Sequence, residues 1–559
     1  QMVEGMPLGI ELAAAWVSML SCGEIADEIE RGMDFLATSM RDVPERQRSL
    51  RAAFDHSWGL LSGDERAVLC RLAVFRGGFE REAAEEVAGA SLGSLLGLVS
   101  KSLVRRTENG RYDLHEVVRQ YALSHLVEDA PGEAATRDRH SEVYMGLLRD
   151  RELALKGAAQ REAIRELTDE IDNVRAAWAW AVRREKYGYI GPALRSFALL
   201  ADLGGWLGQG IEQIEAVVQG LRGRSEDEER QRVLGQALTQ QGDLLFRQGQ
   251  FEQAITRLEE SLSILRPIGD PALLVGPLIF SGTIMHLGGK FDRAQLLVDE
   301  GLACAEAAGD EWFMAYALLN QGYIASQVGG YSEGYEQMLA GLARWRALGD
   351  LRYTALGLNF ISPTAIKLGH YEEAGAFLQE SLTLCRQVGD RWGMGTAYRY
   401  LGLLALAQGD FAEAKALIHK SLDLFDKVVT GWDIALSLVY LGQATAAAGD
   451  STEARRVFLD ALQVAVEAQA TLLAMDALIG LAYLQAQAGR TEQALELCIC
   501  VSSHSASSQE AKDRARQLRA QVESQLTPQQ NESVQARAQA QAFDALVAEL
   551  LNASQGNPC

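Results

Sequence analysis

Residues that could hold a metal or perform covalent catalysis are few and scattered in this 559-residue chain. Cys498 and Cys500 stand two residues apart, but no second Cys or His pair follows at metal-site spacing. We therefore interpret both as small buried apolar side chains. The seven cysteines are odd in number and dispersed, which favours reduced thiols in a cytoplasmic protein over a disulfide framework. The sequence predicts no catalytic residue and no metal site.

A phosphate-binding loop is also missing from the sequence. No Gly-x-x-x-x-Gly-Lys-Ser/Thr segment occurs, so neither a cradle of backbone N–H groups nor a lysine is available for nucleotide phosphates. No acidic pair follows a hydrophobic strand to hold magnesium. We expect that this chain alone is not an enzyme and carries no cofactor. Because residues 1–20 are typical of the middle of a domain, we also expect a fragment of a longer protein.

The charge of the chain limits its partners. Lys and Arg total 53 against 75 Asp and Glu, a formal charge of −22. An acidic surface repels nucleic-acid phosphates and anionic lipid, so direct nucleic-acid binding is not expected. Arg46, Arg48 and Arg51 form a small basic group that we interpret as a solvated face. No window of about 18 apolar residues predicts a membrane span.

A regular repeat organises the second half of the chain. It is marked by a series of evenly spaced glycines: Gly249, Gly289, Gly329, Gly369, Gly409, Gly449 and Gly489. In the first complete unit, 237–248 is predicted as one helix and 251–265 as a second. Gly269 then ends the second helix and Asp270 caps the next one. This periodicity predicts a stacked solenoid of helix pairs, which is usually a binding surface.

The small residues of the unit indicate close helix packing. The order Leu238, Gly242, Ala254, Leu258, Ser261 resembles the pattern of the tetratricopeptide repeat family. The units, at about 40 residues, are longer than the roughly 34 residues usual in that family. A further, degenerate unit is expected at about 193–222. The tryptophans at 312, 392 and 432 recur at the start of first helices, which favours stacking between units over a ligand cage.

In that family, the first helices of the pairs line a concave groove. The resemblance therefore implies a groove for a protein, a peptide or a small inducer, with the alternative that these residues form a solvated helix face. The inward positions would be Asp243, Arg247, Thr283, His286, Tyr316, Tyr323, Gln327, Asn359, Lys367, Arg399 and Gln443.

The N-terminal region resembles a second family, the multidomain signal-transduction (STAND, NB-ARC-like) ATPases. The segment 5–14 is similar to the helical subdomain that follows their nucleotide core, and 41–79 is similar to their winged helix. By this resemblance, Gly5 and Pro7 form the turn that packs on adenine. Leu114-His115-Glu116 occupies the place of a Met-His-Asp motif, whose histidine contacts the diphosphate of ADP. The alternative is that His115 only caps the helix that follows it.

Together these patterns predict an all-α chain with a winged-helix-like domain and a tetratricopeptide repeat superhelix of about seven helix pairs. The expected parts are the end of a helical subdomain (1–45), a winged-helix-like domain (46–130), a helical connector (131–192), the solenoid (193–505), and a capping helix with a tail (506–559).

Three functions are consistent with this organisation. The first is the sensor region of a signal-transduction ATPase, in which the repeats bind an inducer or protein and relay this to an upstream nucleotide domain that binds ATP or ADP. The second is a transcription regulator of the same architecture. The third is a plain protein-binding scaffold.

Overall fold

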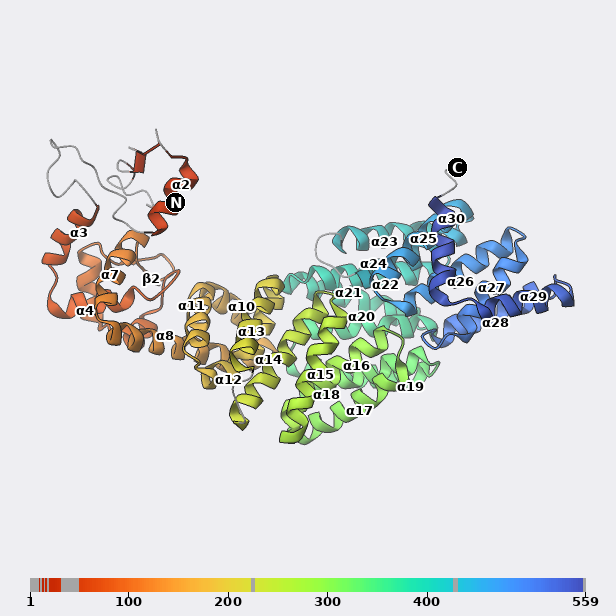
Figure 1. Ribbon diagram of the computed structural model, residues 1–559, viewed down its shortest axis with the longest axis horizontal. Helices are drawn as coiled ribbons and strands as arrows, with labels where there is room; N and C mark the ends of the chain where they lie inside the picture. The colour runs from red at the N-terminus through yellow and green to blue at the C-terminus, as the bar shows by residue number, and fades with distance from the viewer. Residues whose placement is uncertain are drawn as a thin grey trace. The chain divides into compact units, whose positions relative to one another are not determined.

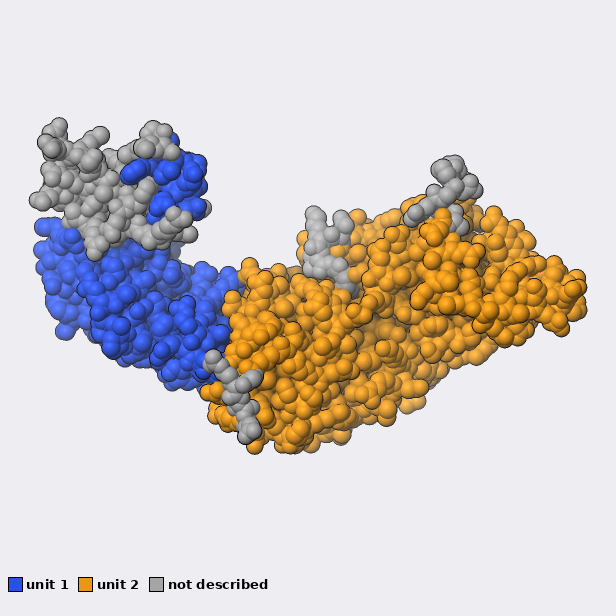
Figure 2. Space-filling model, viewed as in Figure 1, with its two compact units in different colours: residues 1–152, 162–197 blue, residues 153–161, 198–559 orange. Residues whose placement is uncertain are grey.

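The computed structural model describes residues 10, 13, 14, 16, 17, 20–31, 50–222, 227–425 and 431–555. Apart from one two-stranded sheet, the regular elements of the described residues are helices, so the predicted all-α class is confirmed. The chain divides into two compact units (Figure 2). Unit 1 comprises residues 1–152 and 162–197, and unit 2 comprises residues 153–161 and 198–559. The predicted residues Gly5 and Pro7 lie outside the described residues.

Unit 1 is a set of short helices with one hairpin. Its elements are α2 (Cys22–Arg31), α3 (Leu50–Gly59), α4 (Gly63–Leu72), α5 (Arg81–Ala88), α6 (Leu92–Ser100), β1 (Arg105–Arg106), β2 (Tyr112–Asp113), α7 (Glu116–Glu128), α8 (Ala130–Asp150), α10 (Gln160–Asp169) and α11 (Ile171–Arg183). The short α9 (Glu152–Leu155) and α12 (Tyr187–Leu203) each have residues in both units, and the first two residues of α10 belong to unit 2. β1 and β2 are antiparallel, and Gly110 supplies the positive φ of 89° that their turn requires.

The helices predicted as a connector pack onto this small domain. The backbone N–H of Arg76 donates to Asn173 Oδ1 at 2.7 Å, and Asn173 Nδ2 donates to the carbonyl of Gly78 at 2.7 Å. Asn173 is fully buried on α11. Because these bonds tie α11 to the loop before α5, the range 131–192 is not a separate connector. Most of it belongs to unit 1, while 153–161 belongs to unit 2.

Unit 2 contains seven consecutive helix pairs in the part of the chain that the structure describes (Figure 1). The first helices are α14 (Glu228–Arg247), α16 (Pro271–Leu287), α18 (Glu311–Gln327), α20 (Leu351–Lys367), α22 (Arg391–Ala407), α24 (Gly431–Ala447) and α26 (Thr471–Gln487). The second helices are α15 (Phe251–Ile268), α17 (Phe291–Ala308), α19 (Tyr331–Leu348), α21 (Tyr371–Val388), α23 (Phe411–Phe425), α25 (Ser451–Glu467) and α27 (Thr491–Ser503), and their starts are evenly spaced by one repeat. α12 and α13 (Leu207–Leu221) form the predicted degenerate pair.

The turns between helix pairs and the small residues within the helices have the roles that the repeat predicts. Gly269 ends α15 with a φ of 73°, and the Asp270 carboxylate accepts from the N–H of Ala272 at 3.1 Å to cap α16. A Cβ on Gly322 of α18 would lie 2.4 Å from the carbonyl oxygen of Gly334 on α19. The mid-helix glycine is therefore required by the close approach of the two helices of a pair.

The superhelix of unit 2 brings its first and last pairs into contact. Gln469 Nε2 donates to Glu252 Oε1 at 2.8 Å across 217 residues of sequence. A Cβ on Gly289 would lie 2.7 Å from the Cα of Ala506, and Leu287 belongs to the same apolar cluster as Trp432 and Leu478. The repeats therefore form a turn that closes on itself.

Three helices follow the last pair, where the sequence predicted one capping helix with a tail. They are α28 (Gln509–Glu523), α29 (Pro528–Ala540) and α30 (Phe543–Gln555). α29 was missed because its sequence is almost entirely polar. Its single fully buried residue is Val534, and Thr527 and Gln530 form a capping box at its start. Among the described residues, no helix is long and apolar enough to cross a membrane.

Candidate functional site

The predicted inward residues of α14 belong to a buried charge network. Arg247 pairs with Asp202 at 3.1 Å and with Asp243 at 3.0 Å, and it donates to the Tyr353 hydroxyl at 2.5 Å. Arg352, on α20, binds the same Asp202 carboxylate. Burial opposes ionisation of Asp202, yet the two guanidinium groups hold its pKa below the usual value. Asp243 and Arg247 are thus engaged inside the protein.

The next predicted residues lie in a second buried network, centred on Asn320. His286 Nε2 donates to Asn320 Oδ1 at 2.8 Å and Thr283 Oγ1 donates to it at 3.0 Å. Burial lowers the pKa of His286 to about 4, so the ring is neutral at physiological pH. Tyr316 is buried in an aromatic cluster in which Trp312 lies 5.7 Å away, centroid to centroid. The Trp312 Nε1 donates to Asp350 at 2.9 Å, which agrees with the packing interpretation of that tryptophan.

Arg399 and Asn359 are also buried and bonded to the following repeat. Arg399 Nη1 donates to Asp433 Oδ1 at 2.9 Å, and its guanidinium lies 5.9 Å from the Trp432 ring centroid. Asn359 Nδ2 donates to the carbonyl of Gly393 at 3.0 Å. Both residues have a relative exposure of 0%, so neither presents a surface to a partner.

The remaining predicted residues, Tyr323, Gln327, Lys367 and Gln443, retain solvent exposure. They lie on α18, α20 and α24, and Lys367 forms an ion pair with Glu510 of α28. Burial raises the pKa of Tyr323, and the charges of Tyr400 and Asp476 add to this effect. Asp476 on α26 is half-buried as well, so the half-buried part of the inner face includes that helix.

Three charged groups meet there, which we call the inner charge cluster: Lys367, Asp476 and Arg514. Burial raises the pKa of Asp476 to about 6, against the opposing effect of Arg514 and Lys367. Burial lowers the pKa of Lys367 to about 8. Among the described residues, Asp476 and Arg514 make no hydrogen bond or close ion pair, although each is only half exposed. A perturbed, unpaired carboxylate of this kind is typical of functional sites.

Sequence reasoning missed Asp476, Arg514 and Tyr440. A signal for Asp476 was present, because it stands four repeats after Tyr316 and so occupies the same position of the unit. Tyr440 lies one repeat after Tyr400, and their ring centroids are 6.5 Å apart. Arg514 lies beyond the repeats on α28, and no periodicity could have placed it.

His115 lies at the start of α7. Its Nδ1 accepts a hydrogen bond from the N–H of Val117 at 3.4 Å, so the side chain caps the helix. This agrees with the alternative interpretation of His115 and leaves its nucleotide-sensing role a prediction.

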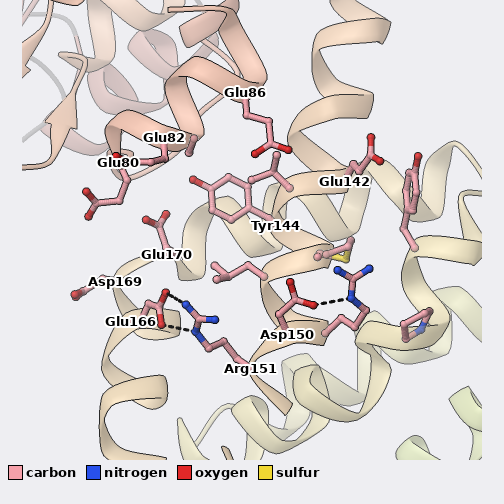
Figure 3. A pocket seen from close by; sticks show the side chains of 18 of the residues that line it. Glu80, Glu82, Glu86, Glu142, Tyr144, Asp150, Arg151, Glu166, Asp169 and Glu170 are labelled. Carbon is pink, nitrogen blue, oxygen red and sulfur yellow. Dashed lines mark hydrogen bonds and ion pairs between the residues drawn. The ribbon is translucent and has the colours of Figure 1, made fainter. Parts of the chain in front are cut away.

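A second candidate site, not predicted from the sequence, is a cleft of about 1000 Å³ within unit 1. Side chains of α5, α8, α10 and the start of α12 line it (Figure 3). Arg151 pairs with Glu166 at 2.6 Å and Arg149 pairs with Asp150 at 2.7 Å. Carboxylates outnumber these guanidinium groups on the walls. No sequence pattern indicated the cleft, because packing alone brings α5 against α8.

The described residues contain no group of three or more His, Cys, Asp or Glu side chains placed to hold a metal ion.

Comparison with known proteins agrees with the repeat architecture. Residues 353–427 match the tetratricopeptide repeat family. The matched segment begins in α20 and covers α21, α22 and α23. Unit 2 therefore contains a tetratricopeptide repeat domain. One solved structure with a similar fold is a signal transduction ATPase with numerous domains and a tetratricopeptide repeat sensor from Pyrococcus horikoshii. It shares 14% sequence identity, with 95% of this chain and 74% of that chain covered and a TM-score of 0.47.

Two mycobacterial proteins are similar in sequence. The first, from Mycobacterium bovis, is named "Putative HTH-type transcriptional regulator Mb0914c" and is 34% identical over 298 residues. That alignment covers 50% of this chain and 33% of the relative. The second, from the same organism, is named "Uncharacterized protein Mb0918" and is 38% identical over 144 residues, or 24% of this chain and 36% of the relative. The chain therefore matches about a third of the length of each relative.

Proposed function

We propose that this chain is the sensor and regulatory portion of a cytoplasmic signalling protein, and that its tetratricopeptide repeats bind a protein, a peptide or a small inducer on their inner face. The observation that carries this proposal is Asp476. Its carboxylate is half-buried, has a pKa raised to about 6, and makes no hydrogen bond or close ion pair among the described residues. A carboxylate of this kind is costly to a structural scaffold and useful to a binding site.

The residues that would recognise the ligand are those of the half-buried inner face. Lys367, Asp476 and Arg514 would supply the charge, and Tyr323 and Tyr440 would supply aromatic surface. The buried residues His286, Asn359 and Arg399, and the partly buried Arg247, would hold the helices in register. This division refines the sequence prediction, in which all inward residues were equal candidates.

The test is a capture experiment with the purified chain and a cell lysate. Asp476→Asn and Tyr440→Phe should release the captured partner, whereas Asp423→Asn, an exposed change on α23, should retain it. Thermal-shift screening of small molecules with the same three variants covers the case of a small inducer. Unchanged capture by Asp476→Asn would mean that the inner face is not the site. Arg399→Ala is unsuitable here, because removal of a fully buried ion-pair partner tests stability.

We further propose that unit 1 relays the signal to a nucleotide-binding domain of the complete protein. The arrangement of α4, α5, α6 and the β1–β2 hairpin is consistent with a winged helix. His115 would then sense the diphosphate of ADP, while the chain by itself would bind no ATP and have no enzymatic activity. In the full-length protein, His115→Ala should weaken ADP binding in a titration. Equal ADP affinity in the two proteins would leave His115 only its capping role.

The second candidate function is transcription regulation, which the name of the first mycobacterial relative favours. The formal charge of −22 is unfavourable for direct contact of this chain with DNA. Retarded migration of duplex DNA by the purified chain at moderate salt would favour the regulator. If only the full-length protein retards DNA, the present chain is the sensing part of such a regulator.

A further inference from the structure

Unit 2 contains a line of contact between repeats that are far apart in the sequence. We call it the seam and define it by six residues: Gly289, Gly329, Lys367, Ala506, Gln509 and Glu510. The first three belong to the second, third and fourth helix pairs, whereas the last three lie in the first turn of α28 or just before it. The seam is therefore the place where the end of the repeat domain meets its first half.

Close packing distinguishes the two glycines of the seam from those of the following pairs. A Cβ on Gly289 would lie 2.7 Å from the Cα of Ala506, and one on Gly329 would lie 3.2 Å from a side-chain atom of α28. A Cβ on Gly369 or Gly409, in the equivalent turns of the next two pairs, would meet no atom of the described residues within 4 Å. All four glycines take a positive φ, so the turn is common to them and the close contact is added by the seam.

The seam divides the inner charge cluster between its two sides. Lys367 stands at the end of α20, whereas Asp476 and Arg514 stand on α26 and α28. The three groups lie within electrostatic reach of one another, because Arg514 and Lys367 oppose the effect of burial on the pKa of Asp476. Arg514 in turn adds to the lowering of the Lys367 pKa by burial. The cluster is therefore complete only while the seam is closed.

These charges oppose closure of the seam. Asp476 and Arg514 are partly buried, yet neither makes a hydrogen bond or close ion pair among the described residues. Removing an unpaired charge from water costs free energy. The contacts that favour closure include Leu287 of α16, which joins the apolar cluster of α24 and α26, and the Lys367–Glu510 ion pair. That pair is partly exposed, and such pairs contribute little to stability. A ligand that pairs with the cluster would remove part of the cost of closure.

We propose that the seam opens and closes in the folded chain, and that its closure completes the inner-face site by bringing Lys367 to Asp476 and Arg514. This inference rests on the inner-face binding proposed above and adds its regulation. A ligand that contacts groups on both sides of the seam binds the closed form better, so it shifts the population toward closure. Binding is thereby reported as a change in the distance between α20 and α28.

The first test uses the unmodified chain, with the ion pair of the seam as a reporter. A water-soluble carbodiimide joins an amine to a carboxylate that is in contact with it, so it should link Lys367 to Glu510, and mass spectrometry of the digest identifies the link. With rising urea, this link should disappear at a midpoint well below that of the helical signal in circular dichroism. The Lys186–Asp138 pair of unit 1, at 3.1 Å, controls for the effect of urea on the reaction. Coincident midpoints would overturn the proposal, because the seam would then open only when the whole unit unfolds.

The second test places a bulky side chain at the opposite end of the seam. Gly289→Leu inserts it against Ala506, whereas Gly409→Leu adds the same side chain at an exposed glycine with a similar positive φ. The first variant should lower the yield of the Lys367–Glu510 link about tenfold without loss of helicity, and the second should leave it unchanged. A full yield in Gly289→Leu would overturn the proposal, because the contacts of the seam would then be independent of one another. If Gly289→Leu does not fold, the urea comparison decides alone.

The seam and the inner-face function fail in different ways. Gly289→Leu should also release the partner of the capture experiment, which Gly409→Leu should retain. If the link responds as expected but Asp476→Asn still captures its partner, the seam opens without completing a binding site, and the proposed function fails with it. If Asp476→Asn releases the partner while the link follows neither expectation, binding on the inner face stands and its control by the seam is excluded.

Discussion

At the residue scale, two buried histidines link stability to pH. Burial lowers the pKa of both His140 and His286 to about 4, while in the unfolded chain a histidine titrates near 6.5. Because the unfolded state binds the protons more readily, their contribution to stability is complete above pH 6.5 and is lost as pH falls toward 4. For His286 alone this amounts to on the order of 3 kcal/mol over the window.

His286→Gln should therefore flatten part of this pH dependence. Glutamine can still donate to Asn320 Oδ1, but it does not titrate. The loss of unfolding free energy between pH 7 and pH 5 should be roughly 2 kcal/mol smaller in the variant, as measured by urea denaturation at the two pH values. His419→Gln, at an exposed position on α23, is the control and should behave as the unmodified chain. An identical pH dependence in all three proteins would show that the folded and unfolded states bind the His286 proton equally, and would contradict the lowered pKa.

The sequence indicated which residues face inward, but not which of these side chains are buried and bonded to a neighbouring repeat. His286, Asn359 and Arg399 each bond to a residue 34 positions later, namely Asn320, Gly393 and Asp433. Each of these bonds links one first helix to the next. Such pairs are not found when each repeat unit is considered separately, because the partner belongs to the neighbouring unit. A recurring spacing slightly shorter than the repeat itself is the signal that would have revealed them.

At the element scale, the glycines of the helices serve different purposes. Gly322→Ala should destabilise unit 2 by about 1–3 kcal/mol, because the new Cβ would meet the Gly334 carbonyl at 2.4 Å. Gly375→Ala, within α21, should instead stabilise by up to about 1 kcal/mol, since its nearest neighbour is Leu404 Cδ2 at 3.5 Å. Thermal denaturation of the two variants gives the comparison. An unchanged or raised melting temperature in Gly322→Ala would refute the packing role of Gly322.

The helix boundaries were predictable where residues next to the boundary determine them. Gly309 and Gly349 take a left-handed conformation, and Asp310 and Asp350 cap the following helices, as expected from the Gly-Asp pairs. The division of the range 131–192 was not predictable. It depends on Gln160, which donates to Asp350 at 3.2 Å across 190 residues, and no local pattern reports such a bond.

At the scale of the whole repeat domain, the contact between first and last pairs can be tested by cross-linking. Cysteines introduced at Glu252 and Gln469 should be joined by a short bismaleimide in the folded chain, because the native side chains meet at 2.8 Å. Mass spectrometry of the digested protein would identify the linked peptides. The control replaces Glu252 together with Glu372, the same position three repeats later, and should give no such link. The reverse result would exclude a closed turn.

The contact of Glu252 with Gln469 also has a consequence for how the domain is made. A linear array of repeats is stabilised one neighbour at a time, so it can gain or lose units from its ends and can fold as it leaves the ribosome. Here the first helix pair can form its contact with Gln469 only after the chain has been synthesised to that residue, 217 positions beyond Glu252. Contacts of such high sequence separation slow folding and join both ends in one cooperative transition. Biogenesis of this domain is therefore expected to finish late, in a single step that waits for its C-terminal helices.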